Sequence, residues 1–382
     1  MTRIASFNVE NLFERPRAFG ATQLSVAKPI LDAYREVNGL FGKASYTAAD
    51  KAKMKSRLLD LDIYTRNAHG AIRRKNTQNP KWAWLRKNRG AFDREPQDPG
   101  QDVEIIATGR SDWIGWVELA TEPVNEIGTR MTARVIQELN ADIIGIVEAE
   151  DRPSLLRFNE ELLGGMYRHI MLIDGNDERG IDVAILTKVG FEIESVRSNV
   201  DAEDSGGIIF SRDCAQYGVR TPGGTSVHIL VNHFKSQSGG GGAKRRRQAV
   251  EVRRIADGLV QQGQNVVVLG DLNEGPTQVG APAQNLSPLY DAGSPLIECY
   301  ALPGFDAGGR PGSFDSCTLR NRLDYIFVSA GLQSAVAGGG LFRKGLWGDR
   351  PTRPTAWVTF PEITRSVEQA SDHSAVFVDF NF

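Results

Sequence analysis

Apolar and polar positions alternate along much of this chain. Alternation with a period of two residues predicts β-strands, because successive side chains of a strand point to opposite faces of a sheet. The pattern predicts strands in IASFNVENLF at 4–13, ADIIGIVEAE at 141–150, YRHIMLID, IDVAILTK and FEIESVRS. A hairpin is predicted for CAQYGVRTPGGTSVHILVNHF, since Pro222-Gly223-Gly224 separates two alternating runs. Three more strands are predicted for VVVLGD, RLDYIFVS and SAVFVDF.

A second period, close to 3.6 residues, predicts helices. It occurs in Ile30–Phe41, Ala48–Thr65, Glu126–Asn140 and 243–263. Thr47, followed three residues later by Asp50, resembles a capping box and marks the start of the second helix. The third helix has a single apolar stripe, formed by Ile127, Met131, Val135 and Leu139. The chain is therefore predicted to combine helices with a larger number of strands.

The order of these elements indicates the fold class. Strands that follow one another in hairpins, with helices only now and then between them, are typical of an α+β fold and not of a doubly wound parallel sheet. Between residues 14 and 124 the pattern changes, with more charge, more Trp and less regular alternation. The strand at 4–9 needs partners from further along the chain. We therefore expect a single domain over residues 1–382, with 14–124 as an insertion or subdomain within it.

The composition is that of an ordinary globular protein, with 41% hydrophobic and 24% charged residues. The formal net charge is -2 at pH 7, so a polyanionic partner would have to meet a local patch of positive charge. The three cysteines contain no metal-spaced pair, and their odd number argues against a disulfide framework. The first residues, MTRIASFNVE, lack the apolar stretch of a signal peptide, and no apolar run approaches the ~20 residues of a membrane span. We expect a cytoplasmic protein without a membrane partner.

Polar side chains stand where the apolar part of one strand after another ends. They are Asn8 and Glu10, Glu148, Asn232 and His233, Asp271 and Asn273, Asp324, and Asp372 and His373. Any one of these residues is by default a turn or cap residue. Their repetition at several strand ends favours a shared site instead.

The chemistry of this set is that of phosphate ester hydrolysis. Many oxygen ligands with only two imidazoles favour Mg²⁺ or Mn²⁺ over Zn²⁺. A carboxylate can orient and deprotonate water, while a metal ion and a protonated imidazole neutralise charge on phosphoryl oxygens. The residue types alone do not identify the substrate.

The motifs that carry these residues resemble a known family. FNVENLF, DIIGIVEAE, VNHFKS, GDLNEGP, RLDYIFVS and SDHSAV occur in the order found in the endonuclease/exonuclease/phosphatase superfamily, which includes DNase I and exonuclease III. The resemblance covers both ends and most of residues 126–382. The motifs NVENLF and VNHFKS are most similar to those of bacterial nucleases of this superfamily. It implies a four-layer α/β/β/α sandwich of two mostly antiparallel sheets flanked by helices, with a large helical insertion after the first strand.

The resemblance also implies a metal site with Mg²⁺ or Mn²⁺ as the cofactor. In this reading, Glu148 is the principal metal carboxylate. Asn8, Glu10 and Asp372 help to bind the metal or the phosphate that it holds, and Asp271 lies at the same centre. The resemblance is compatible with a centre of one metal ion and with a centre of two.

Roles in the reaction follow from the same resemblance. Asp271 is similar to the carboxylate that positions or deprotonates the attacking water, and Asn273 to the amide that orients water and phosphate. His373 is similar to the imidazole beside the scissile phosphate, with Asp324 as its orienting carboxylate. His233 matches a second active-site histidine of the DNase I-like branch. With Asn8, these residues form the predicted catalytic set.

A run of positive charge provides a candidate substrate surface. Between Arg66 and Arg89 there are eight Lys or Arg residues and no Asp or Glu, with two tryptophans interleaved. This run is either a solvated face or a nucleic-acid surface, with cations for phosphates and Trp for bases. We favour the second interpretation, with Arg73, Arg74, Lys75, Trp82 and Trp84 as the contacting residues.

Two further cations are candidate phosphate clamps. They are Arg179 and Lys235, although an ion pair with Asp177, Glu178 or Asp182 is an equal alternative for Arg179. The run 244–247, KRRR, opens a predicted helix, where positive charge is unfavourable unless an anion lies nearby. A substrate phosphate or simple solvation would each account for this run.

The leading interpretation is a divalent-metal-dependent phosphodiesterase, a nuclease that hydrolyses DNA or RNA by attack of activated water. The sequence is compatible with a single-stranded or a double-stranded substrate, and with endonuclease or exonuclease cleavage. One alternative is a phosphatase or phospholipase of the same fold, acting on inositol phosphates or sphingomyelin. Another is a catalytically dead binding module, which the intact carboxylates, Asn273 and His373 disfavour. No protein partner is inferred.

Overall fold

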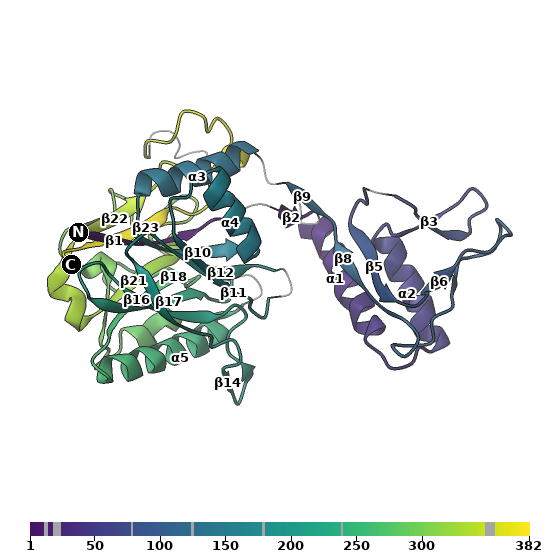
Figure 1. Cartoon of the computed structure of the whole chain (residues 1–382), viewed down its shortest axis with the longest axis horizontal. Helices are drawn as coiled ribbons and strands as arrows, with labels where there is room; N and C mark the ends of the chain where they lie inside the picture. Colours follow the sequence, from purple (N-terminus) through teal and green to yellow (C-terminus); the bar gives the residue numbers. More distant parts are fainter. Residues whose placement is uncertain are drawn as a thin grey trace. The chain divides into compact units, whose positions relative to one another are not determined.

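The computed structural model of the chain describes residues 1–10, 14–17, 24–77, 79–123, 126–177, 180–237, 240–347 and 356–382. Tertiary contacts divide the chain into two compact units. Unit 1 comprises Met1–Phe13 and Val124–Phe382, and unit 2 comprises Glu14–Pro123. Figure 1 shows the elements of each unit, coloured along the sequence.

Unit 1 is built around two large sheets. The first has seven strands in the order β11 (His169–Ile173), β12 (Asp182–Thr187), β10 (Ile143–Ala149), β1 (Thr2–Asn8), β23 (Ala375–Phe380), β22 (Val336–Phe342) and β20 (Phe305–Asp306). The second has six strands in the order β13 (Glu192–Arg197), β16 (Cys214–Arg220), β17 (Ser226–His233), β18 (Asn265–Asp271), β21 (Asp324–Ser329) and β19 (Leu296–Glu298). Only β1–β10, β20–β22 and β17–β18 pair in parallel. The expectation of two mostly antiparallel sheets is confirmed.

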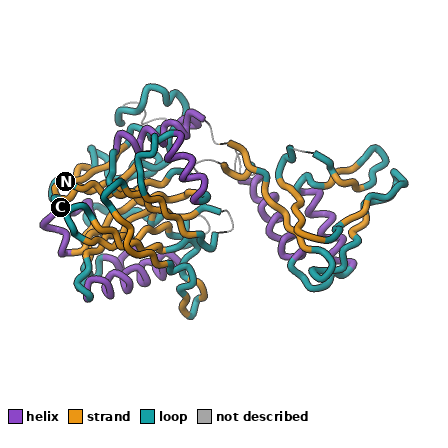
Figure 2. The backbone as a smooth tube through the Cα atoms, viewed as in Figure 1, coloured by secondary structure: helices purple, strands orange, loops and turns teal. Residues whose placement is uncertain are grey.

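Helices cover the outer face of each sheet, as Figure 2 shows. The helices α3 (Glu126–Leu139) and α4 (Arg152–Glu161) share a hydrophobic core with the seven-stranded sheet, in which Val135 and Phe158 meet Ile144. Helix α5 (Gly242–Gln261) shares another core with the six-stranded sheet. A third core fills the space between the sheets. Unit 1 is therefore the predicted four-layer α/β/β/α sandwich.

Two glycines let the sheets and strands approach closely at the end where the predicted site lies. A Cβ at Gly145 of β10 would come within 2.3 Å of Leu269 Cδ1 of β18, in the opposite sheet. Gly270 adopts φ 136°, and a Cβ there would meet the carbonyl oxygen of Asn232 at 1.9 Å. A larger residue at Gly145 would displace the core side chain of Leu269, and one at Gly270 would push against the backbone of Asn232. The glycines therefore help to hold β10, β17 and β18 at the spacing that the site needs.

Helix α4 was not predicted from the sequence. Its start is marked by Asp151, whose side chain accepts a hydrogen bond from the backbone N of Ser154, and by Pro153 in the first turn. The remaining elements of unit 1 are short. They are a hairpin of β14 (Glu203–Asp204) and β15 (Gly207–Ile208), and 3₁₀ turns at Gln284–Leu289, Cys299–Ala301, Leu319–Asn321, Ala330–Ala335 and Ser366–Glu368.

Unit 2 has its own hydrophobic core, in which the rings of Phe41, Phe92 and Trp113 lie 4.6–5.1 Å apart. Its helices are α1 (Leu24–Phe41) and α2 (Ala48–Asp60). Its strands form two-stranded ribbons: β2 (Glu14–Pro16) with β9 (Thr121–Pro123), β3 (Tyr64–Arg66) with β4 (Ile72–Arg74), β5 (Ala83–Arg89) with β8 (Ile114–Leu119), and β6 (Asp93–Arg94) with β7 (Glu104–Ile105).

Unit 2 differs in detail from the sequence prediction. The capping box of Thr47 and Asp50 is confirmed. The first helix begins at Leu24 and not at Ile30, and the second ends at Asp60 and not at Thr65. The second helix stops early because Asp62 adopts φ 59°, a left-handed conformation that a helix cannot continue. No helix in the described part of the chain has the length and apolarity needed to cross a membrane.

Candidate active site

Both sheets of unit 1 bring polar residues to the same end of the sandwich. β1 and β10 run parallel, so Asn8 and Glu148 lie together where these strands end. In the other sheet, β17 and β18 also run parallel, and His233 is paired in register with Asp271. β21 runs antiparallel to β18, which places its first residue, Asp324, opposite Asp271. The strand directions thus explain why these residues converge.

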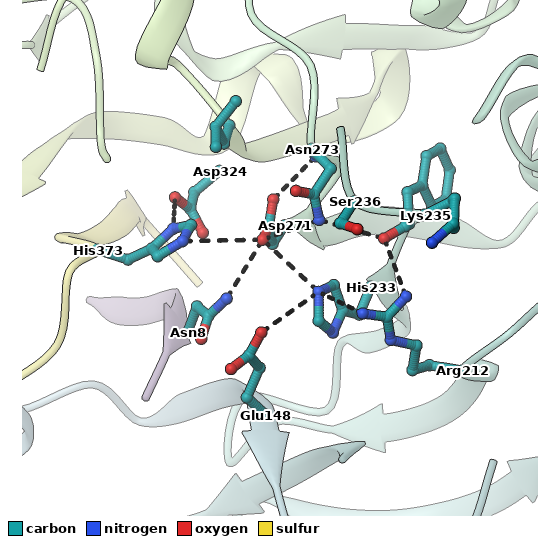
Figure 3. A network of polar contacts seen from close by, with 12 residues as sticks. Asn8, Glu148, Arg212, His233, Lys235, Ser236, Asp271, Asn273, Asp324 and His373 are labelled. Atoms are coloured by element: carbon teal, nitrogen blue, oxygen red, sulfur yellow. Dashed lines mark hydrogen bonds and ion pairs between the residues drawn. The ribbon is translucent and has the colours of Figure 1, made fainter. Parts of the chain in front are cut away.

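The carboxylate of Asp271 lies at the centre of this cluster (Figure 3). Its Oδ2 accepts hydrogen bonds from Asn8 Nδ2 at 3.2 Å and from Asn273 Nδ2 at 3.1 Å. The same oxygen lies 3.7 Å from Nε2 of His233 and 3.9 Å from Nε2 of His373. These two distances are longer than hydrogen bonds. Asp271 is therefore held by two amides and flanked by two imidazoles.

Asp324 orients the ring of His373. Nδ1 of His373 lies 2.7 Å from Oδ2 of Asp324, and the Ser313 hydroxyl donates to the same oxygen at 2.6 Å. Burial alone would lower the pKa of His373, but the Asp324 carboxylate outweighs burial, and the pKa is raised well above its ordinary value. The Asp324 carboxylate therefore favours the protonated form of His373, whose Nε2 faces Asp271 (Figure 3).

Burial also changes the acidity of Asp271, of which only 2% is exposed. Desolvation raises the pKa of this carboxyl to about 7, although the charge of His373 favours its ionised form. A group whose pKa lies near the working pH is suited to general base catalysis. Asp271 thus combines a fixed position with the acidity that proton transfer from water requires.

Three of the predicted site residues have backbone conformations that are uncommon outside glycine. The φ angle is 50° at Glu10, 67° at Glu148 and 55° at Asn273. Glu148 also lies at a bulge, where the pairing of β10 with β12 shifts in register. Bulges re-aim side chains, and such conformations cluster at functional sites. The bulge brings Oε1 of Glu148 to 3.6 Å from Nε2 of His233.

The predicted metal ligands Glu10 and Asp372 lie next to each other. Oε2 of Glu10 accepts a hydrogen bond from the backbone N of Asp372 at 2.9 Å. Desolvation raises the pKa of Asp372 although its side chain is 36% exposed, and the nearby carboxylates of Glu10 and Glu148 raise it further. Three acidic side chains thus repel one another at the end of the first sheet.

This donor set fits a divalent cation. In the part of the chain that the structure describes, no group of three or more His, Cys, Asp or Glu side chains is placed to hold a metal ion. Mg²⁺, however, is commonly bound through only one or two carboxylates and keeps several water ligands. A cation would also relieve the repulsion that raises the pKa of Asp372. The carboxylates and the Asn8 amide could therefore hold a divalent cation that keeps several of its water ligands.

Arg212 belongs to the cluster but was not predicted. Its side chain is 2% exposed, and Nη2 lies 3.3 Å from Nε2 of His233 (Figure 3). Nε lies 3.1 Å from Oδ2 of Asp177. Because arginine can only donate, Nε2 of His233 is the acceptor in this contact. A signal for Arg212 exists: it lies two residues before β16, whose start pairs with the end of β17.

The run 244–247 has carboxylate partners inside the protein. Arg245 is buried, and its Nε lies 2.7 Å from Oε2 of Glu274, directly after Asn273. Its Nη1 donates to the carbonyl oxygens of Lys235 and Ser236, each at 3.1 Å. Arg245 thus joins the segment after His233 to the segment after Asp271. Elsewhere in the run, Arg247 pairs with Asp204.

The cations predicted to bind substrate also have partners. The expectation of a run without counter-charges is wrong, because carboxylates outside the run approach it. The pairs are Arg73–Glu95 at 2.9 Å, Arg74–Asp93 at 3.1 Å, Lys75–Asp62 at 2.5 Å and Arg86–Glu118 at 3.0 Å. Contact of these residues with nucleic acid stays a prediction.

The two tryptophans of the run differ in their surroundings. Trp82 packs against the core of unit 2, and Nζ of Lys81 lies 4.6 Å from its ring centre. Trp84 lines a cavity of about 120 Å³ together with Arg74 and Lys75, and Cζ of Arg86 lies 4.9 Å from its ring centre. Each ring therefore has a cation over it, and Trp84 also borders a cavity.

The remaining predicted clamps lie in unit 1. Arg179 lies outside the described residues. Lys235 follows His233, and its backbone N donates to Oε1 of the buried Gln248 at 2.9 Å. All three cysteines are buried and free, in agreement with the expectation of no disulfide framework.

Comparison with known proteins found a family model and several solved structures to which this chain is similar. A model of the endonuclease/exonuclease/phosphatase family matches residues 88–287. A mannosyl-6-phosphatase of Bacteroides thetaiotaomicron is 18% identical, with 67% of this chain and 92% of that chain covered and a TM-score of 0.49. The catalytic domain of human Nocturnin with bound sulfate is 17% identical (67% and 87% covered, TM-score 0.48). Truncated TDP2 of Caenorhabditis elegans is 20% identical (66% and 90% covered, TM-score 0.46). No curated protein was found to match the sequence.

Proposed function

The chain belongs to the endonuclease/exonuclease/phosphatase family, whose members are phosphoric ester hydrolases, and we propose that it is a divalent-metal-dependent phosphodiesterase that cleaves nucleic acid. The observation that carries this proposal is the position of Asp271. A buried carboxylate with a pKa of about 7 lies between two imidazoles and two amides, beside a group of acidic residues. This arrangement suits attack of water on a phosphodiester.

The metal would be held by Glu148, with Asn8, Glu10 and Asp372 as further or water-mediated ligands. When bound, Mg²⁺ or Mn²⁺ would polarise the phosphoryl oxygens and neutralise their charge. The bulge at Glu148 and the hydrogen bond between Glu10 and Asp372 hold these carboxylates in place beforehand. Such pre-positioning avoids reorganisation when the ion arrives.

Asp271 would accept the proton of the attacking water. Its Oδ1 is fixed by the backbone N of Asn273 at 2.8 Å, so the carboxylate cannot rotate freely. The side-chain amide of Asn273 bonds to Oδ2 and also to the carbonyl oxygen of Phe234, at 3.1 Å each. This clamp aims the carboxylate in one direction, which is what a general base requires.

His373 would bind the phosphate beside Asp271, and His233, whose Nε2 accepts from Arg212, would help to position Glu148 and Asp271. The charged ring of His373 can donate from Nε2 to a phosphoryl oxygen, while Asp324 stabilises its positive charge. His233 lies between Glu148 and Asp271, with the permanent charge of Arg212 behind it. Together these groups would stabilise negative charge as it grows in the transition state.

Nucleic acid is the proposed substrate class because the motifs resemble bacterial nucleases and because unit 2 is rich in Lys and Arg. We propose that residues 14–124 are an insertion in a single catalytic domain and serve the substrate and not the chemistry. Arg73, Arg74, Lys75, Trp82 and Trp84 remain its candidate contacts, with Arg179 and Lys235 in unit 1.

A substrate panel tests the proposal. Single-stranded DNA, duplex DNA, RNA, bis-p-nitrophenyl phosphate and p-nitrophenyl phosphate are assayed with Mg²⁺, with Mn²⁺ and with EDTA. We expect cleavage of a nucleic acid and of the diester, both lost in EDTA. Asp271→Asn should abolish the activity, while Asp213→Asn, at another buried aspartate of unit 1, should preserve it. Preference for the monoester over every diester would identify a phosphatase and refute the proposal.

A further inference from the structure

Unit 2 contains a cavity of about 700 Å³ between helix α2 and the ribbons that follow it. Lys51 and Lys55 of α2, one helical turn apart, line one wall, and Arg66 of β3 lines another. The same helix face carries Ala48, Ala52 and Ser56, whose small side chains leave the cavity open. This volume lies within the range of ligand sites in proteins.

Two of the three cations of this cavity, Lys51 and Lys55, lie outside the run between Arg66 and Arg89, and Arg66 is its first residue. Nζ of Lys51 donates to the carbonyl oxygen of Ile105 at 2.9 Å, and Nη1 of Arg66 donates to that of Gly70 at 2.8 Å. A carbonyl oxygen carries no net charge, so neither hydrogen bond neutralises its cation, although the charge of Lys51 helps to lower the pKa of Glu104. Among the described residues, no carboxylate lies within 4 Å of either one. Lys55 has a distant partner, Asp102 Oδ2 at 3.9 Å.

The two carboxylates in the lining are already engaged. Oδ1 of Asp102 accepts a hydrogen bond from the backbone N of Ile72 at 2.8 Å. Glu104 pairs with Arg94 at 2.6 Å, and that hydrogen bond lowers the pKa of Glu104. The charge left for a ligand in the cavity is therefore positive. The ligand that fits is anionic and small enough in cross-section to approach α2.

We propose that this cavity binds the sugar-phosphate backbone of a nucleic acid strand, with Lys51 and Arg66 as the phosphate contacts and Lys55 as a third, weaker one. This inference rests on the proposed function, because it takes the substrate to be a polynucleotide. Lysine and arginine are the usual phosphate contacts, and they fix a strand without reading its sequence. The apolar floor formed by Leu59, Ile72 and Ile105 would lie against sugars or bases.

The test compares two double variants of the full chain. Lys51→Ala/Arg66→Ala removes the two cations without carboxylate partners. Lys53→Ala/Arg57→Ala removes one lysine and one arginine of the same helix, which pair with Glu36 and Asp60. Both variants change the net charge equally. Lys51→Gln/Arg66→Gln, which keeps hydrogen-bonding groups, replaces the first variant if alanine lowers the melting temperature.

Binding of a fluorescein-labelled single-stranded DNA is followed by anisotropy in EDTA, across a range of salt concentrations. We expect the cavity variant to lose affinity and to reduce the slope of log K against log salt by about 0.7 for each phosphate contact removed. The control variant should keep a slope near that of the wild type. Hydrolysis of bis-p-nitrophenyl phosphate with metal should be the same in all variants.

Other outcomes overturn the inference. Wild-type binding by the cavity variant, or equal loss in the control variant, would show that the cavity holds no strand. Competition by poly-glutamate that depends on Lys51 and Arg66 and exceeds competition by DNA would assign the cavity to an acidic protein. Failure of the proposed function appears separately: the wild type would hydrolyse no diester, while binding in EDTA is measured independently.

Discussion

The two units of the molecule differ in how deeply their charged side chains are buried. In unit 1, Asp271, Asp324 and His373 are at most 6% exposed, yet all lie within one network. In unit 2, charged residues pair across exposed ribbons, as in Arg94–Glu104, whose side chains are 69% and 61% exposed. Burying charge costs several kcal/mol per ion unless partners are well placed, whereas an exposed pair contributes about 0–1 kcal/mol.

This difference shows which charged residues indicate a functional site. Buried charges in unit 1 shift the pKa values of Asp271, Asp372 and His373, and such shifts cluster at functional sites. The paired cations of unit 2 show no comparable network. A cluster of charge in the sequence therefore indicates function only after the partners are known.

The largest expected effect comes from breaking a buried pair in unit 1 and an exposed pair in unit 2. Arg245→Ala removes the positive charge beside Glu274 in a mostly buried position, where only the hydrogen bonds from Asn285 would remain. It should lower the free energy of unfolding by about 3–5 kcal/mol. Arg94→Ala, in contrast, should change it by less than about 1 kcal/mol. Urea denaturation measures both. Equal effects would mean that burial does not distinguish the two units.

The second effect concerns turnover. Asp271→Asn and His373→Ala should each lower kcat by at least about 10²-fold, because one removes the base and the other a positive charge that stabilises the transition state. The double variant should be far less than multiplicatively worse, since both groups act on one phosphorus. Steady-state kinetics on bis-p-nitrophenyl phosphate measures this. Near-wild-type kcat in either variant removes that residue from the mechanism.

The third effect concerns the metal. Glu148→Gln should weaken binding of Mn²⁺ and lower activity together, each by at least about tenfold, while the fold is retained. Isothermal titration with Mn²⁺ gives the affinity without reference to activity. Asp177→Asn, which removes a carboxylate next to Arg212, provides the control for loss of negative charge nearby. Full activity in excess EDTA after dialysis would contradict the metal site altogether.

These buried residues are also those that the sequence predicted best. Asn8, Glu148 and Asp271 stand at the ends of strands whose alternation is local, and the motifs around them fix their order. Asp324 and His373 were predicted as a pair, and the structure places them 2.7 Å apart. The α+β class followed from the same local patterns, because the period of each strand can be read from its own residues. The four-layer sandwich was expected from the resemblance to the family.

What the sequence did not reveal depends on partners far along the chain. Arg212 reaches His233 only because β16 pairs with β17. The cations of unit 2 were judged from a window without acidic residues, but Glu95 and Asp62 approach from outside it. The ribbons of unit 2 are also too short to alternate visibly, since β6 and β7 have 2 residues each.

The fourth prediction compares two tryptophans of unit 2 in the binding of single-stranded DNA. Trp84→Ala should weaken binding of single-stranded DNA by about 1–3 kcal/mol if a base stacks on the ring, and should affect duplex less. Trp116→Ala is the matched control, because Trp116 is 45% exposed and belongs to the neighbouring strand β8. Anisotropy in EDTA compares the two. Equal losses on single strand and duplex would show that Trp84 merely supports the fold.

The smallest expected effect tests whether paired cations of unit 2 contact phosphate at all. Lys75→Gln alone unmasks the carboxylate of Asp62, so it weakens binding of a polyanion even without a lost contact. Lys75→Gln/Asp62→Asn removes both charges of the pair and keeps the net charge. Asn also tolerates the φ of 59° at this position.

If the pair is only a solvated surface, this double variant should bind single-stranded DNA like the wild type, with an unchanged salt slope. If Lys75 contacts a phosphate, the slope should fall by about 0.7 despite the constant net charge. The same design extends to Arg73 with Glu95 and Arg74 with Asp93. These neutral double variants could reduce the salt slope while Lys51→Ala/Arg66→Ala leaves it unchanged. That result would place the contacts with nucleic acid at Arg73, Arg74 and Lys75 and not in the cavity. The reverse result would show that charge without a carboxylate partner, and not charge density in the sequence, selects the contacts with nucleic acid.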